Sequence, residues 1–433
     1  VNTQETGTCS GINQALKLIP AKTPFVLTWS DLLFFKKPFL RFNKKYNYVG
    51  QSHNLTCRWQ FYKNKFKEIK SKKNGVAGFF IFKNRNELKN LPMNGEFVQF
   101  LKKENIDFKP LKLINTQEIG TLANYFKIQK NYPPVRPFNQ IIKTKKFVIK
   151  KPLDQQGKKI AVLEKNFYKK FETFNYDFIP KIYKYNPLTL KRINGKSLFL
   201  YKNLTNKNKT EILKNIITSL DKIHQSFPAI NANRDNDYKA IINKTFNRLK
   251  TIKNLIPNTD SDFFIINQKK CFNVFKNWHL VEKTMDHFYP LKYFPIHGDL
   301  TFSNTLYDPI KNKIYIIDPR GYYGDYNLFG DIDYDWAKIY YSLIGNYDQF
   351  NIKNFKLEID KEKINLNITS NNWESLENTF FKLIKADKNK IKFFHSIIWL
   401  SLTTYAWDNI DSILGAFYNG SYLLQDFYDK KTF

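Results

Sequence analysis

The chain has 433 residues, a formal net charge of +32 and 42% hydrophobic residues, a composition too apolar for a disordered polymer and long enough for two or three domains. Its three cysteines, Cys9, Cys57 and Cys271, lie far apart and follow no paired Cys/His spacing, which excludes a disulfide framework and a structural zinc site and favours a reducing, cytoplasmic setting. The most apolar stretch, residues 393–407, is interrupted by polar residues and is too short for a bilayer span, so we expect a buried helix there and no membrane span.

Lysine carries almost all of the positive charge. Of the 70 basic residues eight are arginine, so 62 are lysine. Because arginine reads phosphate and guanine in a fork geometry, its scarcity favours lysine as a solvated surface residue over a nucleic-acid interface. Lysine runs at residues 63–73 and 143–151 keep a lysine-rich RNA-binding protein open as an alternative.

The first part of the chain predicts a mixed α/β sheet domain. Apolar residues at helical spacing predict a helix over residues 12–19, and the apolar run 25–27 predicts a buried strand that ends near Asp31. Further elements are expected as a strand around residues 57–60, an apolar strand over 76–82 and a helix over 96–102.

A proline-rich break follows at residues 131–138, where three prolines remove the backbone donors that a helix or a central strand needs. After it we expect strands at residues 139–142 and 146–150 and helices at 159–173 and 209–225. The remainder is expected to be helical, apart from residues 294–335.

Polar residues that suit phosphoryl transfer gather in that exceptional stretch. Residues 304–308 and 314–318 predict two strands joined by a turn, and symmetric pairing would place Asn304 directly opposite Asp318. An amide oxygen and a carboxylate at that distance suit one Mg2+, and Asp299 on the preceding loop would act as a base. The alternative is that Asp299 and Asn304 only cap turns, while His297 is expected to orient its neighbours rather than to catalyse.

The segment His297-Gly298-Asp299 with Asn304, followed by Ile317-Asp318, resembles the signature of the aminoglycoside phosphotransferase and choline kinase family, which has a protein-kinase-like fold. The resemblance implies Asp299 as catalytic base and Asn304 and Asp318 as magnesium ligands. It implies ATP or another NTP as the second substrate.

The family's motif order extends upstream from this segment. By that order Lys150 pairs with the nucleotide phosphates and with Glu164, and residues 189–193 form a hinge beside adenine. Lys151 is a rival for the role of Lys150, because a strand exposes only one of the two to the nucleotide. No clear glycine-rich loop precedes this strand. The implied nucleotide contacts at the hinge are Leu190, Arg192 and Ile193.

Residues 318–325 and 330–338 resemble a subgroup found with capsule and surface-polysaccharide genes. Asp331 and Asp333, together with Asp335, either bind a cation or a cationic substrate or cap the following helix.

Five short motifs of the first part follow the order seen in sugar-phosphate nucleotidyltransferases: residues 7–12, 29–31, 75–78, 95–96 and 118–121. The resemblance implies Asp31 and Glu118 as magnesium ligands and Gly78 and Glu96 as sugar-phosphate contacts. Glu118 departs from the aspartate usual in that family. The family's glycine-rich loop would fall upstream of Val1, so we expect this domain to be truncated and inactive in this chain; the alternative is that Asp31 and Glu118 are turn residues of a scaffold.

The expected fold class is therefore α/β and α+β. Residues 1–127 form the C-terminal part of a nucleotidyltransferase-like sheet domain of GT-A or Rossmann-like type, residues 128–138 a linker, and residues 139–433 a bilobal kinase-like domain with an N-lobe at about 139–200 and a C-lobe at about 201–433. The expected function is Mg-ATP-dependent phosphorylation of a small hydroxyl-bearing metabolite, fused to a nucleotidyltransferase for a surface-polysaccharide precursor. A catalytically silent kinase-like nucleotide-sensing or docking module is the alternative. No nucleic-acid partner is favoured.

Overall fold

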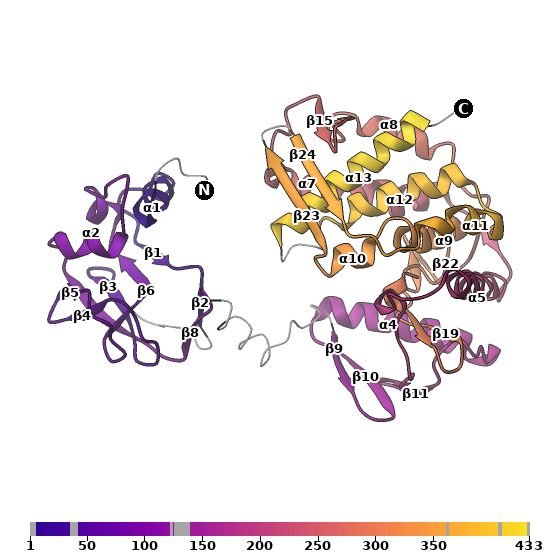
Figure 1. Ribbon diagram of the computed structural model, residues 1–433, viewed down its shortest axis with the longest axis horizontal. Coiled ribbons are helices and arrows are strands. Elements are labelled where there is room, and N and C mark those ends of the chain that lie inside the picture. The colour runs from indigo at the N-terminus through magenta and orange to yellow at the C-terminus, as the bar shows by residue number, and fades with distance from the viewer. Residues whose placement is uncertain are drawn as a thin grey trace. The chain divides into compact units, whose positions relative to one another are not determined.

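The computed structural model describes residues 6–34, 42–121, 124, 139–360, 363–405 and 409–430. The chain divides into two compact units, Val1–Val135 and Arg136–Phe433 (Figure 1). The predicted linker, residues 128–138, lies outside the described residues.

The first unit is built on a six-stranded sheet with the order β5-β4-β6-β3-β7, in which β1 also pairs with β6. Its centre is β6, whose eight residues are all buried, and the rings of Phe80 and Phe97 meet at 5.4 Å. A second sheet pairs β2 with β8. The elements are α1 (Thr8–Leu16), β1 (Phe25–Thr28), β2 (Leu32–Phe34), β3 (Asn47–Ser52), β4 (Gln60–Tyr62), β5 (Lys65–Lys67), β6 (Gly75–Phe82), α2 (Phe97–Lys103), β7 (Phe108–Leu113) and β8 (Thr116–Glu118).

The strand predicted at residues 25–27 is present as β1, but the prediction that it is buried is wrong. Strand β1 pairs with β6 on one side, and its residues alternate between half-buried and exposed, with Val26 46% exposed. An apolar run of three residues cannot distinguish a central strand from a half-covered one, because its neighbours in the sheet decide its burial.

The second unit begins with an antiparallel sheet, order β11-β12-β10-β9, and the long helix α4. This helix starts at Gln155, four residues before the predicted start, because the Asp154 side chain accepts a hydrogen bond from the Gly157 amide and caps it. The elements are β9 (Asn139–Lys143), β10 (Phe147–Pro152), α4 (Gln155–Phe171), β11 (Ile182–Tyr185) and β12 (Leu188–Lys191).

The rest of the second unit is mainly helical, with small sheets of order β13-β18-β19, β14-β17-β22 and β20-β21. Its helices are α5 (Asn206–His224), α6 (Arg234–Asp237), α7 (Lys244–Ile252), α8 (Trp278–Met285), α9 (Ile332–Leu343), α10 (Tyr347–Asn351), α11 (Glu377–Leu383), α12 (Lys388–Leu402) and α13 (Ile410–Lys430). Its short strands are β13 (Lys196–Ser197), β14 (Ile230–Asn231), β17 (Lys292–Pro295), β18 (Thr305–Asp308), β19 (Lys313–Ile316), β20 (Tyr322–Tyr323), β21 (Tyr326–Asn327) and β22 (Phe329–Gly330).

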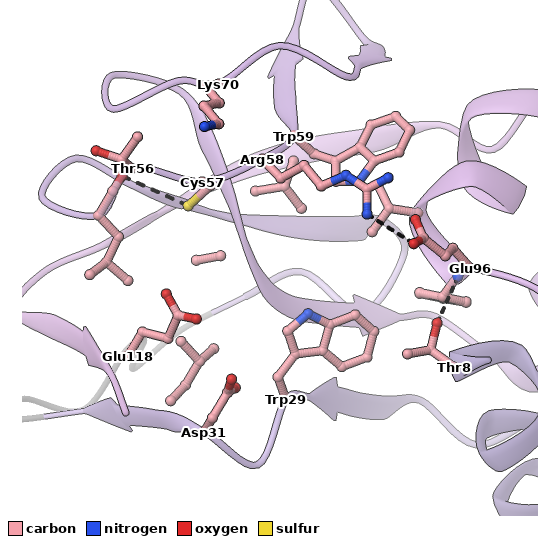
Figure 2. A pocket seen from close by; sticks show the side chains of 16 residues that line it. Thr8, Trp29, Asp31, Thr56, Cys57, Arg58, Trp59, Lys70, Glu96 and Glu118 are labelled. Atoms are coloured by element: carbon pink, nitrogen blue, oxygen red, sulfur yellow. Dashed lines mark hydrogen bonds and ion pairs between the residues drawn. The ribbon is translucent and has the colours of Figure 1, made fainter. Parts of the chain in front are cut away.

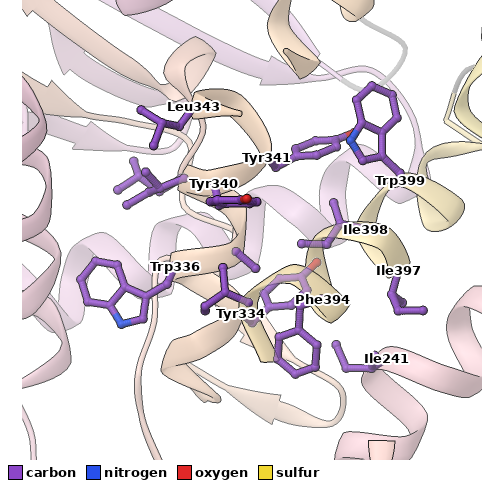
Figure 3. Packing of buried hydrophobic residues seen from close by; sticks show 14 of the residues in the cluster. Ile241, Tyr334, Trp336, Tyr340, Tyr341, Leu343, Phe394, Ile397, Ile398 and Trp399 are labelled. Atoms are coloured by element: carbon purple, nitrogen blue, oxygen red, sulfur yellow. The ribbon is translucent and has the colours of Figure 1, made fainter. Parts of the chain in front are cut away.

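Helices α9 and α12 pack their aromatic faces together in the core (Figure 3). The ring of Tyr341 meets that of Trp399 at 5.0 Å, and Tyr334 meets Phe394 at 6.3 Å. Residues 393–402 of the apolar stretch expected as a buried helix lie in α12 and are buried except for Leu402; the helix ends there, and residues 406–407 of the stretch lie outside the described residues. No helix among the described residues is both long and apolar enough to span a bilayer.

The prediction that only residues 294–335 interrupt the helices is wrong. A four-stranded sheet, order β16-β15-β24-β23, joins β15 (Phe263–Ile266), β16 (Lys269–Phe272), β23 (Phe355–Asp360) and β24 (Lys363–Ile368). Strand β23 alternates half-buried and exposed residues, and the period of two is visible in its sequence FKLEID. Such alternation indicates a strand with one covered face.

Candidate active site

The hairpin of β18 and β19 carries the predicted magnesium ligands, but its register differs from the prediction by one residue. Thr305 pairs with Ile316, and the Ile317 amide donates to the Asn304 carbonyl at 3.0 Å, so Ile317 lies opposite Asn304. Asn304 belongs to the 3-10 turn η6 (Phe302–Asn304), and Asp318 has a left-handed φ of 59°. The expected direct pairing of Asn304 with Asp318 is therefore wrong; both residues lie where the chain leaves the strands.

Asp299 lies beside two cations. Its Oδ1 is 2.9 Å from Lys338 Nζ and 3.8 Å from Arg320 Nη2, and its side chain is 32% exposed. Burial raises the pKa of this carboxyl, but Lys338 and Arg320 outweigh burial and hold the pKa below its ordinary value. The Asn304 amide donates to the Asp299 carbonyl at 2.8 Å. Asp299 is thus an ionised hydrogen-bond acceptor, open to solvent and fixed by its own loop.

His297 and Asp335 hold that loop in place. The Asp299 amide donates to Nδ1 of His297 at 3.3 Å, which leaves Nε2 as the donor to the Ile317 carbonyl at 3.1 Å. Burial lowers the pKa of His297, so the ring is neutral and orients the backbone. The buried Asp335 accepts the amides of His297 and Gly298 at 2.8 and 2.6 Å.

Lys150 of β10 joins two carboxylates. Its Nζ lies 2.7 Å from both oxygens of Glu164 on α4 and 2.9 Å from Oδ1 of Asp318. Lys150 is 7% exposed, whereas Lys151 faces solvent, so the alternation of the strand points Lys150 toward Asp318. Burial raises the pKa of Glu164 to about 7, against the opposing effect of Lys150. This ion-pair triad ties together the sheet that contains β10, helix α4 and the segment after β19.

The predicted hinge contacts are spread over two environments. Leu190 pairs with Val148 and so shares the sheet face of Lys150, with its side chain buried. The Arg192 amide is bonded to Lys146 and its guanidinium to the Thr144 carbonyl, which makes Arg192 part of the sheet end. Ile193 is half-buried in the connection from β12 to β13.

Asp331 and Asp333 share one cation. Lys390 Nζ lies 2.7 Å from Asp331 and 2.9 Å from Asp333, and Asp331 caps α9 by accepting the Asp333 amide. Of the two expected roles, the geometry favours the cap over the binding of a cationic substrate, because Asp331 accepts the Asp333 amide at the start of α9 and Lys390 already contacts both carboxylates.

Sequence reasoning missed the basic residues around Asp299. Lys338 lies on α9, Arg320 on the loop after β19, and Lys244 at the start of α7. Lys244 Nζ lies 5.5 Å and Lys338 Nζ 5.9 Å from the ring of Tyr334, and Arg320 Nη1 lies 3.5 Å from its hydroxyl. The sequence did offer one signal for this cluster. Arginine is scarce in the chain, with eight residues, and one of them, Arg320, lies two residues after Asp318.

We expect Tyr334 to ionise near neutral pH. Burial raises the pKa of this phenol, but Lys244, Lys338 and Arg320 lower it to about 7. The phenolate should therefore appear as the pH rises from about 6 to about 8. The measurement is the near-ultraviolet tyrosinate absorbance of the wild type minus that of Tyr334→Phe; a difference spectrum without a transition in this range would contradict the expectation.

The first unit contains a cavity of about 530 Å³ lined by Asp31, Glu118, Glu96 and Arg58, among others (Figure 2). Strands β2 and β8 bring the first two together, because Leu32 pairs with Glu118 and the Ile119 amide donates to the Asp31 carbonyl at 2.8 Å.

The two carboxylates converge beside Gly120. A side chain placed at Gly120 would approach Asp31 Oδ2 to 2.5 Å and Glu118 Oε1 to 3.3 Å. Asp31 Oδ1 is buried and has no hydrogen-bond partner among the described residues. Such an oxygen is costly unless a ligand satisfies it.

Of the two expected sugar-phosphate contacts, Glu96 lines the cavity and Gly78 does not. Glu96 lines the cavity and is paired with Arg58 at 2.9 Å. Gly78 is not among the residues that line it; at φ 72° it makes room for the indole of Trp29, with which any side chain there would collide.

The predicted magnesium ligands of the two units are all oxygen donors, which suit magnesium. The described residues include no group of three or more His, Cys, Asp or Glu side chains arranged for a metal ion. The sets Asn304 with Asp318, and Asp31 with Glu118, provide two side chains each. Magnesium is commonly held by one or two carboxylates together with substrate phosphates, so both sets fit it in chemistry.

No model of a protein family matches the chain, and no curated protein matches it in sequence. Among solved structures, it is similar to the choline kinase LicA from Streptococcus pneumoniae, with 15% identity, a TM-score of 0.41, and coverage of 71% of this chain and 92% of that chain. A choline/ethanolamine kinase family protein from Mesorhizobium loti is 14% identical, with a TM-score of 0.43 and coverage of 67% and 87%. Macrolide 2′-phosphotransferase type I is 12% identical, with a TM-score of 0.40 and coverage of 69% and 97%. The assignment of a function rests on the side chains described above.

Proposed function

We propose that the second unit is a bilobal, kinase-like phosphotransferase that uses Mg-ATP to phosphorylate a hydroxyl of a small metabolite. The observation that carries the proposal is the triad of Lys150 with Glu164 and Asp318, together with the ionised Asp299 on the adjoining loop. A buried lysine held by a helical glutamate is suited to bind nucleotide phosphates.

Each residue has one role in the proposed step. Asp299 accepts a hydrogen bond from the acceptor hydroxyl and receives its proton as the oxygen attacks the γ-phosphorus. The bond between that phosphorus and the β–γ bridging oxygen breaks, and ADP leaves with the electron pair. Asn304 and Asp318 would hold magnesium, which neutralises phosphate oxygens when it is bound. The low pKa of Asp299 fits a group that orients the hydroxyl more than it deprotonates it.

The experiment is Mg-dependent ATP consumption by the chain across sugars, amino alcohols, amino acids and polyols, including their phosphorylated forms. Formation of ADP that depends on one acceptor supports a small-molecule kinase. Binding of ATP without transfer to any acceptor favours the silent nucleotide-sensing module.

A second candidate function concerns the first unit, and the buried, unpartnered Asp31 Oδ1 favours it. We propose that this unit belongs to a nucleotidyltransferase-type domain, in which Asp31 and Glu118 hold a divalent cation between a nucleotide and a sugar phosphate. Fusion to the kinase would raise the local concentration of a phosphorylated intermediate. A precursor of a surface polysaccharide is the proposed product.

We expect Asp31→Asn to weaken cation binding in the first unit. The change removes one of the two carboxylate charges that converge beside Gly120, so Mn2+ affinity should fall about tenfold or more. Electron paramagnetic resonance measures the Mn2+ affinity. All chains compared also carry Asp318→Asn, which removes the proposed cation site of the second unit. Asp107→Asn, which is exposed and outside the cavity, is the matched control. Equal Mn2+ binding by both variants would sink the proposal.

A further inference from the structure

Among the described residues, three basic side chains gather around Asp299 and the neighbouring Tyr334. Lys338 and Arg320 contact Asp299 itself, and Lys244 shares Tyr334 with both of them. They come from α9, from the loop after β19 and from α7, so three separate elements place charge at one spot. Asp299 and the Tyr334 phenolate balance at most two of these three positive charges.

Lys244 carries the positive charge that its neighbours leave unbalanced. No described carboxylate is recorded within ion-pair distance of its Nζ, and its nearest recorded partner is the face of Tyr334. Burial, with smaller contributions from Arg320, Arg248 and Lys338, lowers the pKa of Lys244 to about 8 against the opposing effect of Tyr334. Among the described residues, Arg248 bonds the neutral groups of Ser401 and Tyr405.

A cluster of desolvated cations is unfavourable unless an anion completes it. The backbone supports a functional origin, because Lys244 directly follows the π-helical segment η4 (Tyr238–Asn243). A π-helical insertion is rare and is frequently found at functional sites.

From this arrangement we propose that the acceptor carries an anionic group, a carboxylate or a phosphate ester, which Lys244 and Arg320 bind while its hydroxyl faces Asp299. The inference rests on the proposed phosphotransferase function and adds its substrate class. Lys338 stays paired with Asp299 and positions it. A quaternary ammonium or polyamine acceptor would be repelled at this place.

The nucleotide phosphates are the rival occupant of these cations. Lys150 binds Glu164 and Asp318, and no ion pair or hydrogen bond joins it to Lys244 or Arg320. The two assignments differ in which Michaelis constant depends on Lys244.

The kinetic experiment compares glycerol, glycerate, glycerol 3-phosphate and ethanolamine as acceptors with Mg-ATP. We expect transfer to an anionic member, and Lys244→Met should raise the KM for that acceptor about ten- to a hundredfold while leaving the KM for ATP unchanged. Lys250→Met, an exposed lysine on the same helix, is the control. Glycerate and glycerol 3-phosphate separate a carboxylate from a phosphate ester. Preference for glycerol or ethanolamine, or a raised KM for ATP in Lys244→Met, overturns the inference and leaves the phosphotransferase function standing.

A binding experiment decides the case in which none of these acceptors is phosphorylated. Inorganic phosphate and glycerate are titrated against the Tyr334 phenolate absorbance at pH near 8, with chloride at equal ionic strength as reference. Tyr334 is faced by Lys244, Lys338, Arg320 and Asp299, so an anion bound to the cations should raise its pKa and reduce the signal. The Lys250→Met variant should respond like the wild type. Absence of a response to either anion overturns the inference, whereas a response to glycerate or phosphate supports it.

Discussion

Replacement of Asp299 by asparagine is expected to lower kcat for phosphoryl transfer roughly a hundred- to ten-thousandfold. Asparagine keeps the shape and the backbone bond to Asn304 but cannot receive the acceptor's proton, and it loses the charge that Lys338 and Arg320 stabilise. The KM for ATP should change little, because no recorded contact joins Asp299 to Lys150. Initial rates of ADP formation measure the effect.

Asp325→Asn is the matched control, since Asp325 is an exposed aspartate of the same unit that pairs with Lys239. Its rate should equal that of the wild type. A wild-type rate in Asp299→Asn would remove Asp299 from the catalytic role.

Replacement of Lys150 by methionine is expected to destabilise the second unit by about 3–5 kcal/mol and to abolish ATP binding. The change leaves Glu164 and Asp318 close together without their shared cation. It also removes the group assigned to the nucleotide phosphates. Denaturant unfolding measures the stability, and calorimetric titration with ATP and Mg2+ measures the binding.

Lys151→Met, the exposed neighbour on the same strand, should leave both quantities unchanged. A double variant, Lys150→Met with Glu164→Gln, separates folding from function. Removing the second buried charge should restore part of the stability without restoring ATP binding. Wild-type ATP affinity in the folded double variant would contradict the assignment of Lys150.

The sequence predicts local structure of this chain better than it predicts which segments meet. The helix ending in Phe171 and the strands around Lys150 follow from local periodicity, and structure and expectation differ there only in their bounds, most at the helix start that Asp154 caps. The hairpin register was wrong by one residue, because the 3-10 turn before Thr305 and the left-handed Asp318 move both predicted ligands off the strands. The alternation of residues along a strand does not show where the chain leaves the strand, so it could not predict this register.

The basic cluster could not be predicted from spacing. Lys244, Arg320 and Lys338 are separated by many residues and belong to three elements, and only tertiary packing brings them to Tyr334. With 62 lysines in the chain, one functional lysine leaves no compositional signal. The convergence of Asp31 and Glu118, by contrast, was expected from motif order, and the pairing of β2 with β8 accounts for it.

The most direct test of the phosphotransferase account is calorimetric binding of a non-hydrolysable ATP analogue to the whole chain, with and without Mg2+, because it requires no knowledge of the acceptor. The account predicts binding that strengthens at least tenfold with Mg2+, in the wild type and equally in Asp299→Asn, since Asn304 and Asp318 hold the cation and Lys150 the phosphates. Binding that is absent, or that is indifferent to Mg2+, would contradict it.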